Sequence, residues 1–155
     1  MKVQICAVGR LRSGPEAELV SDYLARFDRT GRPHGLGPAT VTEVEDRKGG
    51  GMAAEAELLQ RSLPSGVLTI VMDERGQMPS SPDFAAMLTR WRDQGRDLAF
   101  VIGGAGGLLP AFRAQADAVI SFGTMVWPHM LVRVMLAEQL YRAATIVAGT
   151  PYHRA

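Results

Sequence analysis

Residues 98–108 have the sequence LAFVIGGAGGL, and this stretch decides the fold class. Its first five residues are apolar and include β-branched and aromatic side chains, which predicts a buried strand over 98–102. Four glycines follow within residues 103–107, and a short helix is predicted over 109–116. A strand that ends in glycines and leads into a helix is typical of open α/β sheets, which bind ligands at this edge.

The rest of the chain continues this alternation of strand-like and helix-like segments. Strands are predicted over 2–8, 39–45, 67–72 and 117–121, and helices over 15–28, 52–63 and 128–147. A further helix is predicted to open at Ser81-Pro82-Asp83, with Ser81 as its N-cap. In the first helix, Leu19, Tyr23 and Phe27 are spaced four apart and are expected to face the core. The alternation predicts one α/β domain over residues 1–155, with a mostly parallel sheet and helices on both faces.

Composition describes an ordinary globular protein. The chain has 155 residues, of which 46% are hydrophobic and 21% charged, and its net charge is +1. No apolar run is long enough to span a bilayer, and the N-terminus lacks the pattern of a signal peptide. The single cysteine, Cys6, lies in an apolar run, so we expect a reduced, cytoplasmic setting and no metal site. With so little net charge, nucleic-acid binding would need a local basic patch.

The glycine cluster has two interpretations. It lacks the Lys-Ser/Thr pair of a phosphate loop, and Leu109 takes the place of the third glycine of a dinucleotide fingerprint. A ligand here is therefore expected to lack a triphosphate. The alternative is a tight turn that lets strand and helix pack closely.

A second loop, residues 122–127, contains four large apolar side chains, one glycine and one threonine. Such a surface suits an aromatic base and a thioether or sulfonium better than it suits phosphates. Met125, Val126 and Trp127 could equally belong to the core.

The last helix is apolar around nearly its whole circumference between Leu131 and Val147. A helix of this kind must be buried on all sides, and one sheet covers only one side, so a homodimer through this helix is predicted. On that interpretation, Leu136→Glu should abolish association. Glu138 and Arg142 are four residues apart and are expected to form an ion pair.

Two motifs near the C-terminus carry a family resemblance. They are Pro128-His129-x-Leu131-Val132-Arg133-Val134-x-Leu136-Ala137-Glu138-Gln139-Leu140-Tyr141-Arg142-Ala143 and Pro151-Tyr152-His153-Arg154. With the N-terminal run from Val3 to Gly9, they closely resemble the large-subunit ribosomal RNA methyltransferases H, a family of the SPOUT class. The resemblance covers the whole chain. It implies a C-terminal deep trefoil knot, a homodimer, S-adenosylmethionine as cofactor, and methylation of N3 of a pseudouridine in 23S rRNA, on the assembled ribosome.

The same resemblance assigns site residues. The cofactor pocket would be lined by Met72, Gly103, Gly104, Phe122, Gly123, Thr124, Met125, Val126 and Trp127. In the tail, Tyr152 could stack on the target base, and loss of the base's proton would be favoured either by Arg154, which would stabilise the anion, or by His153, which would accept the proton. RNA contacts would come from Arg10, Arg12, Arg47, Lys48 and Arg133. His129 is interpreted as a cap or packing residue, and it and Arg133 are the alternative catalytic pair if the tail is a disordered end.

Two other classes of function remain open. A knotted RNA-binding protein that has lost catalysis would bind no S-adenosylmethionine. A flavodoxin-type nucleotide-binding protein would need a phosphate-cradling loop after the first strand, where this chain has the short basic segment Gly9-Arg10-Leu11-Arg12-Ser13-Gly14.

Overall fold

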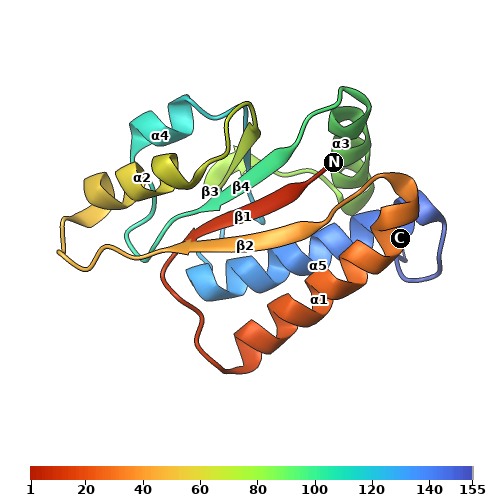
Figure 1. Cartoon of the computed structure of the whole chain (residues 1–155), viewed down its shortest axis with the longest axis horizontal. Helices are drawn as coiled ribbons and strands as arrows, with labels where there is room; N and C mark the ends of the chain where they lie inside the picture. The colour runs from red at the N-terminus through yellow and green to blue at the C-terminus, as the bar shows by residue number, and fades with distance from the viewer. Residues whose placement is uncertain (155) are drawn as a thin grey trace.

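A computed structural model describes residues 1–154 of the chain and forms one α/β domain (Figure 1). Five parallel strands make one sheet in the order β2-β1-β4-β3-β5. The strands are β1 (Val3–Val8), β2 (Ala39–Val44), β3 (Leu68–Gln77), β4 (Leu98–Ile102) and β5 (Ala118–Ile120). The helices are α1 (Pro15–Gly31), α2 (Gly51–Ser62), α3 (Ser81–Asp93), α4 (Pro110–Ala114) and α5 (His129–Ala148), with a 3₁₀ turn, η1 (Arg32–His34). The predicted parallel α/β architecture is confirmed.

Helices cover both faces of the sheet because its central strands are apolar on both sides. On β1, Ile5 and Ala7 face one core cluster, which also holds the buried side chains of α1, α3 and α5. Cys6 and Val8 face a second cluster with residues of α2 and α4. Figure 1 shows α1 and α5 on one side of β1 and β2, and α2 and α4 on the other.

The start of α3 and the buried face of α1 differ from the predictions by about one residue. Ser80, and not Ser81, is the N-cap of α3, because its hydroxyl accepts the backbone N–H of Asp83 at 3.1 Å. Ser81 lies inside the helix and donates to Gln139 of α5. In α1, Leu19 is 43% exposed, since the helical period turns Val20, Leu24 and Phe27 toward the sheet.

Helix α5 is covered mainly by its own chain, so its apolar circumference does not by itself require a second subunit, and the homodimer stays a prediction. Leu136, Ala137 and Leu140 are fully buried against the sheet, α1 and α3. Leu136→Glu would therefore disrupt the core of each subunit and is no test of association. The exposed apolar side chains lie at the start of the helix, where Met130 and Leu131 are each 40% exposed. Within residues 1–154, no helix is both long and apolar enough to cross a membrane.

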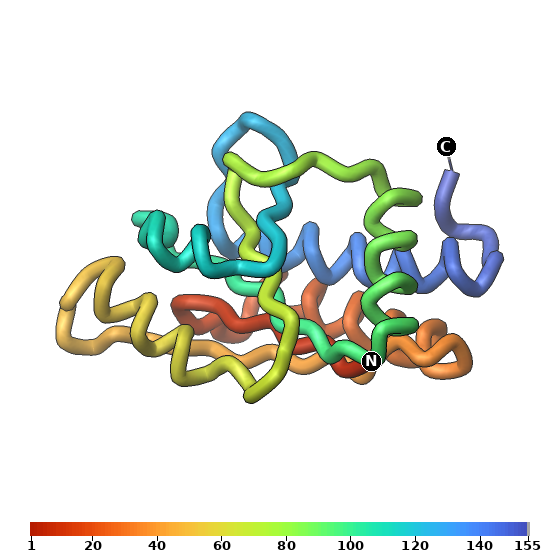
Figure 2. Tube along the Cα trace, turned by 90° about the horizontal axis from the view of Figure 1, so that it is seen from above, coloured from red at the N-terminus to blue at the C-terminus, as the bar shows by residue number. Residues whose placement is uncertain are grey.

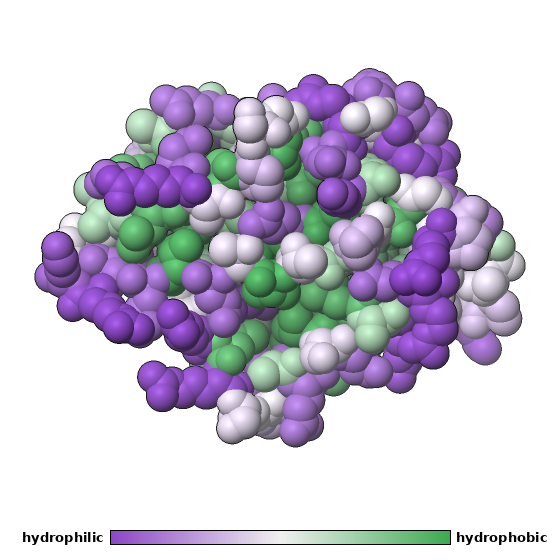
Figure 3. All heavy atoms as spheres, viewed as in Figure 1, coloured by the Kyte–Doolittle hydropathy of each residue, from purple (hydrophilic) through white to green (hydrophobic). Residues whose placement is uncertain are grey.

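A shallow apolar groove of about 440 Å³ runs between the edge strand β2 and α1. Its lining includes Leu11, Val20, Leu24 and Val41. Figure 3 shows apolar residues gathered in the middle of this face, with polar side chains around them.

Strand β3 continues five residues past the predicted end at Met72, to Gln77. A register irregularity separates Met72 from Gln77, and both residues pair with Ile120 of β5. Between them, a Cβ on Gly76 would lie 2.6 Å from the carbonyl of Val119, so only glycine allows this close approach of the two strands. The extension brings residues 73–77 beside the loop that follows β5.

Candidate functional site

The main cleft lies at the carboxyl edge of the sheet and has a volume of about 790 Å³. Three segments supply most of its lining: Met72–Arg75 of β3, the glycine loop 103–108 after β4, and the segment from 120 to 129 except Thr124; Met52 of α2 and Arg113 of α4 also contribute. Figure 2 shows the segments after β3 and β5 side by side at this end of the molecule. Because all strands are parallel, their following loops meet at one edge, which is where open α/β sheets bind ligands. The volume is typical of a small-molecule site.

The predicted cofactor residues collect in this cleft, with one exception. Met72, Gly103, Gly104, Phe122, Gly123, Met125, Val126 and Trp127 all line it. Thr124 is exposed and does not line it. The alternative that Met125 and Val126 are core residues is wrong, since they are 72% and 81% exposed.

The glycine loop folds back on itself, and part of its glycine content serves this turn. Gly107 N–H donates to the carbonyl of Gly104 at 3.0 Å. A Cβ on Gly103 would lie 2.8 Å from Leu108, so that glycine is required by the loop's own packing. A Cβ on Gly104 would lie 3.0 Å from the carboxylate of Glu55 and 3.1 Å from Val8. A side chain at Gly104 would therefore be crowded by the protein itself.

Two other glycines border the open part of the cleft. A Cβ added to Gly107 or Gly123 would meet no atom of residues 1–154 within 4 Å. Ser121 fixes the second of these: its hydroxyl donates to the carbonyl of Gly123 at 2.8 Å and accepts that residue's N–H at 3.0 Å. Backbone next to such free space can approach a ligand closely.

An ion pair that sequence reasoning missed lies in the same cleft. Asp73 is almost buried, and one of its oxygens lies 3.4 Å from the guanidinium of Arg113 on α4. Arg75 reaches the other oxygen at 3.5 Å. Asp73 was noticeable as the residue after an apolar strand, but nothing in the spacing of Arg113 marks it as a partner.

His129 begins α5 and also lines the cleft. Its Nδ1 atom is buried and has no hydrogen-bond partner within residues 1–154. Burial, together with the nearby charge of Arg133, lowers the pKa of His129 below its ordinary value. Both effects favour the neutral form of the imidazole.

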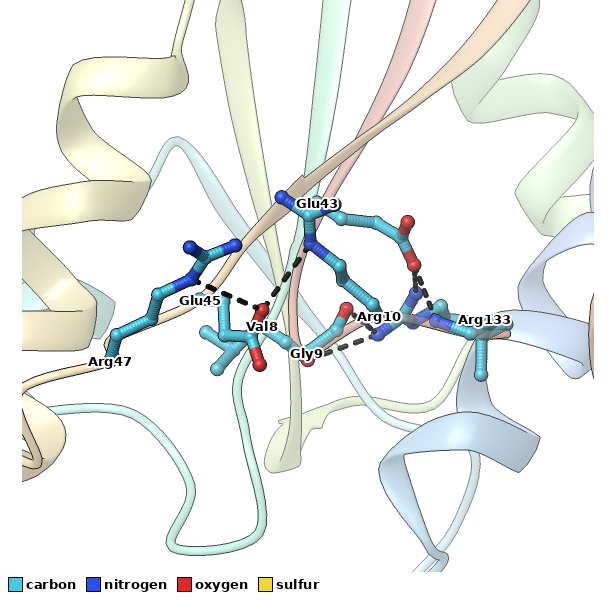
Figure 4. Close-up of polar contacts among 8 residues, drawn as sticks. Val8, Gly9, Arg10, Glu43, Glu45, Arg47 and Arg133 are labelled. Carbon is cyan, nitrogen blue, oxygen red and sulfur yellow. Dashed lines mark hydrogen bonds and ion pairs between the residues drawn. The ribbon is translucent and has the colours of Figure 1, made fainter.

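Arg133 has a structural environment, which corrects its assignment as an RNA-contacting residue. Its side chain is only 1% exposed. The guanidinium donates to Glu43 at 2.7 Å and to the carbonyls of Val8 and Gly9 at 3.0 and 2.6 Å (Figure 4). Glu43 also accepts the backbone N–H of Leu11 at 2.7 Å. Arg133 therefore ties α5 to the ends of β1 and β2, and its guanidinium is enclosed by these partners.

The other four predicted RNA contacts are exposed on the loops after β1 and β2, at the same edge of the sheet as the cleft. Arg10 and Arg47 both pair with Glu45, at 3.3 and 4.0 Å (Figure 4). Exposed pairs of this kind contribute about 0–1 kcal/mol, so a phosphate can readily replace the carboxylate. Arg12 and Lys48 are exposed beside them.

The C-terminal tail folds back against the middle of α5, at residues 138–142. Tyr152 is half-buried, with its ring centroid 4.5 Å from that of Tyr141, and its hydroxyl donates to Glu138 at 3.0 Å. Burial and Glu138 raise the pKa of Tyr152 to about 12. Glu138 and Arg142 form the predicted ion pair, at 2.6 Å. The Tyr152 ring is tilted by 56° against that of Tyr141, and the guanidinium of Arg142 lies 4.8 Å from its centroid, so stacking of Tyr152 on a base stays a prediction.

The cleft lies at the start of α5, whereas the tail leaves the other end of the helix and folds back along it (Figure 2). Tyr152 and His153 contact Glu138 and Arg142, which are 9 and 13 residues past His129. At 1.5 Å per residue, these contacts lie about 14–20 Å from the cleft end of the helix. None of the three tail residues Tyr152, His153 and Arg154 lines the cleft of their own chain.

Comparison with known proteins gives a consistent result. Residues 1–153 match the model of a family described as predicted SPOUT methyltransferases. The chain is 68% identical over 154 residues to the ribosomal RNA large subunit methyltransferase H of Cereibacter sphaeroides, and 69% identical over 155 residues to that of Dinoroseobacter shibae; the matches cover 99% of each chain.

Solved structures support the fold alone. A probable methylase family protein from Haemophilus influenzae has a TM-score of 0.52 at 13% identity, over 99% of this chain and 70% of its own. A probable methyltransferase from Bordetella pertussis has a TM-score of 0.50 at 15% identity, over 92% of this chain and 96% of its own.

Proposed function

This chain belongs to the SPOUT methyltransferase family, as a large-subunit ribosomal RNA methyltransferase H, and we propose that it methylates N3 of a pseudouridine in 23S rRNA on assembled ribosomes. The observation that carries the proposal is the cleft at the carboxyl edge of the sheet, where a glycine loop and an exposed apolar loop meet beside two basic loops. That substrate places the enzyme in the cytoplasm.

The cleft fits S-adenosylmethionine as methyl donor. Met125, Val126 and Trp127 offer an apolar surface for an adenine ring, and Gly107 and Gly123 leave space for close backbone approach. Asp73 offers a carboxylate that could hold a cationic or hydroxyl group of the ligand. When bound, the cofactor supplies a methyl group whose bond to sulfur breaks, with its electron pair staying on sulfur, as the bond to N3 forms.

The chain's own residues position the base and stabilise its charge. N3 of the target is an imide nitrogen, and its proton must leave before its lone pair can attack. A cation near the base favours that loss by stabilising the anion. Arg154 is exposed at the end of the tail and can supply this charge. Arg10, Arg12, Arg47 and Lys48 would hold the phosphates of the RNA on the same edge of the sheet as the cleft, which makes binding sensitive to salt.

The separation of tail and cleft supports a homodimer. A second copy with its α5 antiparallel to the first would bring the tail of one subunit to the cleft of the other. The surface available for such contact lies at the start of α5, where Met130 and Leu131 are each 40% exposed. Apolar side chains that are exposed together on a surface are often part of an interface.

We also propose that the chain has the trefoil knot that the family implies. The segment after β5 lies beside the extension of β3, and Ser121 N–H donates to the carbonyl of Gln77 at 2.7 Å. In the proposed knot, the C-terminal segment would be threaded at this place, where residues of β3 and the segment after β5 pair next to the glycine loop.

Methyl transfer to defined RNA substrates tests the function. Ribosomes, large subunits and free 23S rRNA from a strain lacking this protein are incubated with the enzyme and labelled S-adenosylmethionine. The proposal predicts one methyl group per ribosome, at N3 of a pseudouridine, and little transfer to free rRNA. A protein that binds ribosomes but no S-adenosylmethionine would instead be the inactive RNA-binding form.

A further inference from the structure

The contacts of His153 determine which of its ring nitrogens carries the proton. Its Nδ1 atom lies 3.3 Å from Nη1 of Arg142. An arginine guanidinium has only N–H donors, so the histidine nitrogen that faces it must be the acceptor. Of the two neutral tautomers, only the one with its proton on Nε2 leaves Nδ1 free to accept.

Arg142 is held in the orientation that this contact requires. Its Nε and Nη2 atoms both donate to one oxygen of Glu138, at 3.0 and 2.6 Å, which directs Nη1 away from the carboxylate. The guanidinium also lies 4.8 Å from the ring centroid of Tyr152. The hydrogen bond to Glu138 raises the pKa of Arg142, so the donor keeps its charge.

From this geometry we propose that His153 donates a hydrogen bond from Nε2 to a carbonyl oxygen of the target base and does not remove its proton. Glu138 and Arg142 are then positioning residues that fix the tautomer of His153. The inference rests on the proposed function, and it reverses the proton-acceptor role expected for this histidine. With Nδ1 bonded to Arg142 and Nε2 protonated, the ring has no free lone pair for the N3 proton.

This arrangement suits an imide. N3 lies between two carbonyl groups, and its negative charge after deprotonation spreads onto both oxygens. A neutral N–H donor on one oxygen and the Arg154 cation on the other would stabilise that charge from two sides. The N3 proton passes to bulk water, and the electron pair that it leaves on nitrogen forms the new bond to carbon.

Nitrogen-15 NMR of the imidazole rings tests the tautomer without cofactor or RNA. The two-bond and three-bond correlations distinguish a protonated ring nitrogen from one with a lone pair, and the signals lost in His153→Gln identify this residue among the three histidines. We expect only the Nε2–H tautomer in the native protein. Arg142→Lys, which keeps a donor, should retain it, and Arg142→Met should give a mixture of both tautomers. A native protein with its proton on Nδ1, or an unchanged tautomer in Arg142→Met, would overturn the inference.

Methylation kinetics then separate donor from base. Glutamine places an amide N–H near the position of the imidazole Nε2–H but cannot take up a proton. We expect His153→Gln to retain methylation within about tenfold of the native rate, and His153→Ala to lose about a hundredfold, the cost of one donor to a developing oxyanion. Equal losses in the two variants would contradict the donor role. No methylation by the native protein would instead refute the proposed function and leave the NMR result standing.

Discussion

Replacing Arg133 with methionine should lower the free energy of unfolding by about 3 kcal/mol. The guanidinium makes hydrogen bonds to Glu43 and to the carbonyls of Val8 and Gly9 in a site that is 1% exposed. Methionine has similar length but no donor, so both carbonyls lose a partner at about 1 kcal/mol each. Glu43 loses its ion pair but is 28% exposed and keeps the N–H of Leu11, so we add only about 1 kcal/mol for it.

Urea unfolding followed by circular dichroism at a fixed protein concentration measures this loss. Arg12→Met is the matched control, since Arg12 is exposed on the neighbouring loop and its replacement should change the unfolding free energy by less than about 0.5 kcal/mol. Arg133→Lys should retain little of the stability that Arg133→Met loses, because one ammonium group cannot reach the carboxylate and both carbonyls at once. A loss below about 1 kcal/mol in Arg133→Met would refute the structural role and return Arg133 to the candidates for RNA contact.

Four further perturbations have defined outcomes. If the protein forms the proposed dimer, Leu131→Glu should convert it to a folded monomer in sedimentation at micromolar concentration, and a dimer that survives would move the interface elsewhere. Gly106→Leu should weaken S-adenosylmethionine binding at least tenfold in calorimetry. A Cβ at this cleft position meets nothing closer than Met52 at 3.6 Å, so the added side chain is free to occupy the cleft. Thr124→Leu, which lies outside the cleft, is the control. Arg154→Ala should reduce the methylation rate about a hundredfold with cofactor binding unchanged, and an unaltered rate would remove the tail from the reaction. Between pH 10 and 12 the unfolding free energy should fall as pH rises, because folding raises the pKa of Tyr152 to about 12 and the fold stabilises the neutral form. A Tyr152→Phe variant whose unfolding free energy falls equally steeply with pH would contradict this.

The order and type of the elements were predictable from sequence because each strand is a short apolar run and each helix has a marked start or face. The predicted N-cap of α3 was wrong by one residue. Ser80 and Ser81 are adjacent, and only the geometry shows which hydroxyl accepts the N–H of Asp83. The apolar circumference of α5 correctly indicated burial. It could not indicate what covers the helix, and α1, α3 and the sheet cover most of it.

The site was predictable in position more than in detail. Apolar and glycine-rich loops at strand ends located the cleft, because parallel strands bring their carboxyl ends to one edge. Charge alone could not distinguish the enclosed Arg133 from the exposed Arg10, since the difference depends on Glu43, which lies 90 residues away in sequence. The contact between Arg142 and His153 likewise depends on how the tail folds back onto α5 after Gly149, whose left-handed backbone ends the helix.

The most direct test of the proposed reaction is the modification state of 23S rRNA in cells that lack this protein. Pseudouridine-containing fragments are compared by mass spectrometry between the deletion strain, the same strain with the native gene restored, and the strain carrying Arg154→Ala. We predict that one N3-methylated pseudouridine disappears on deletion, returns with the native gene, and returns only in part or not at all with Arg154→Ala. An unchanged set of methylated pseudouridines in the deletion strain would contradict the assignment of this enzyme to that base.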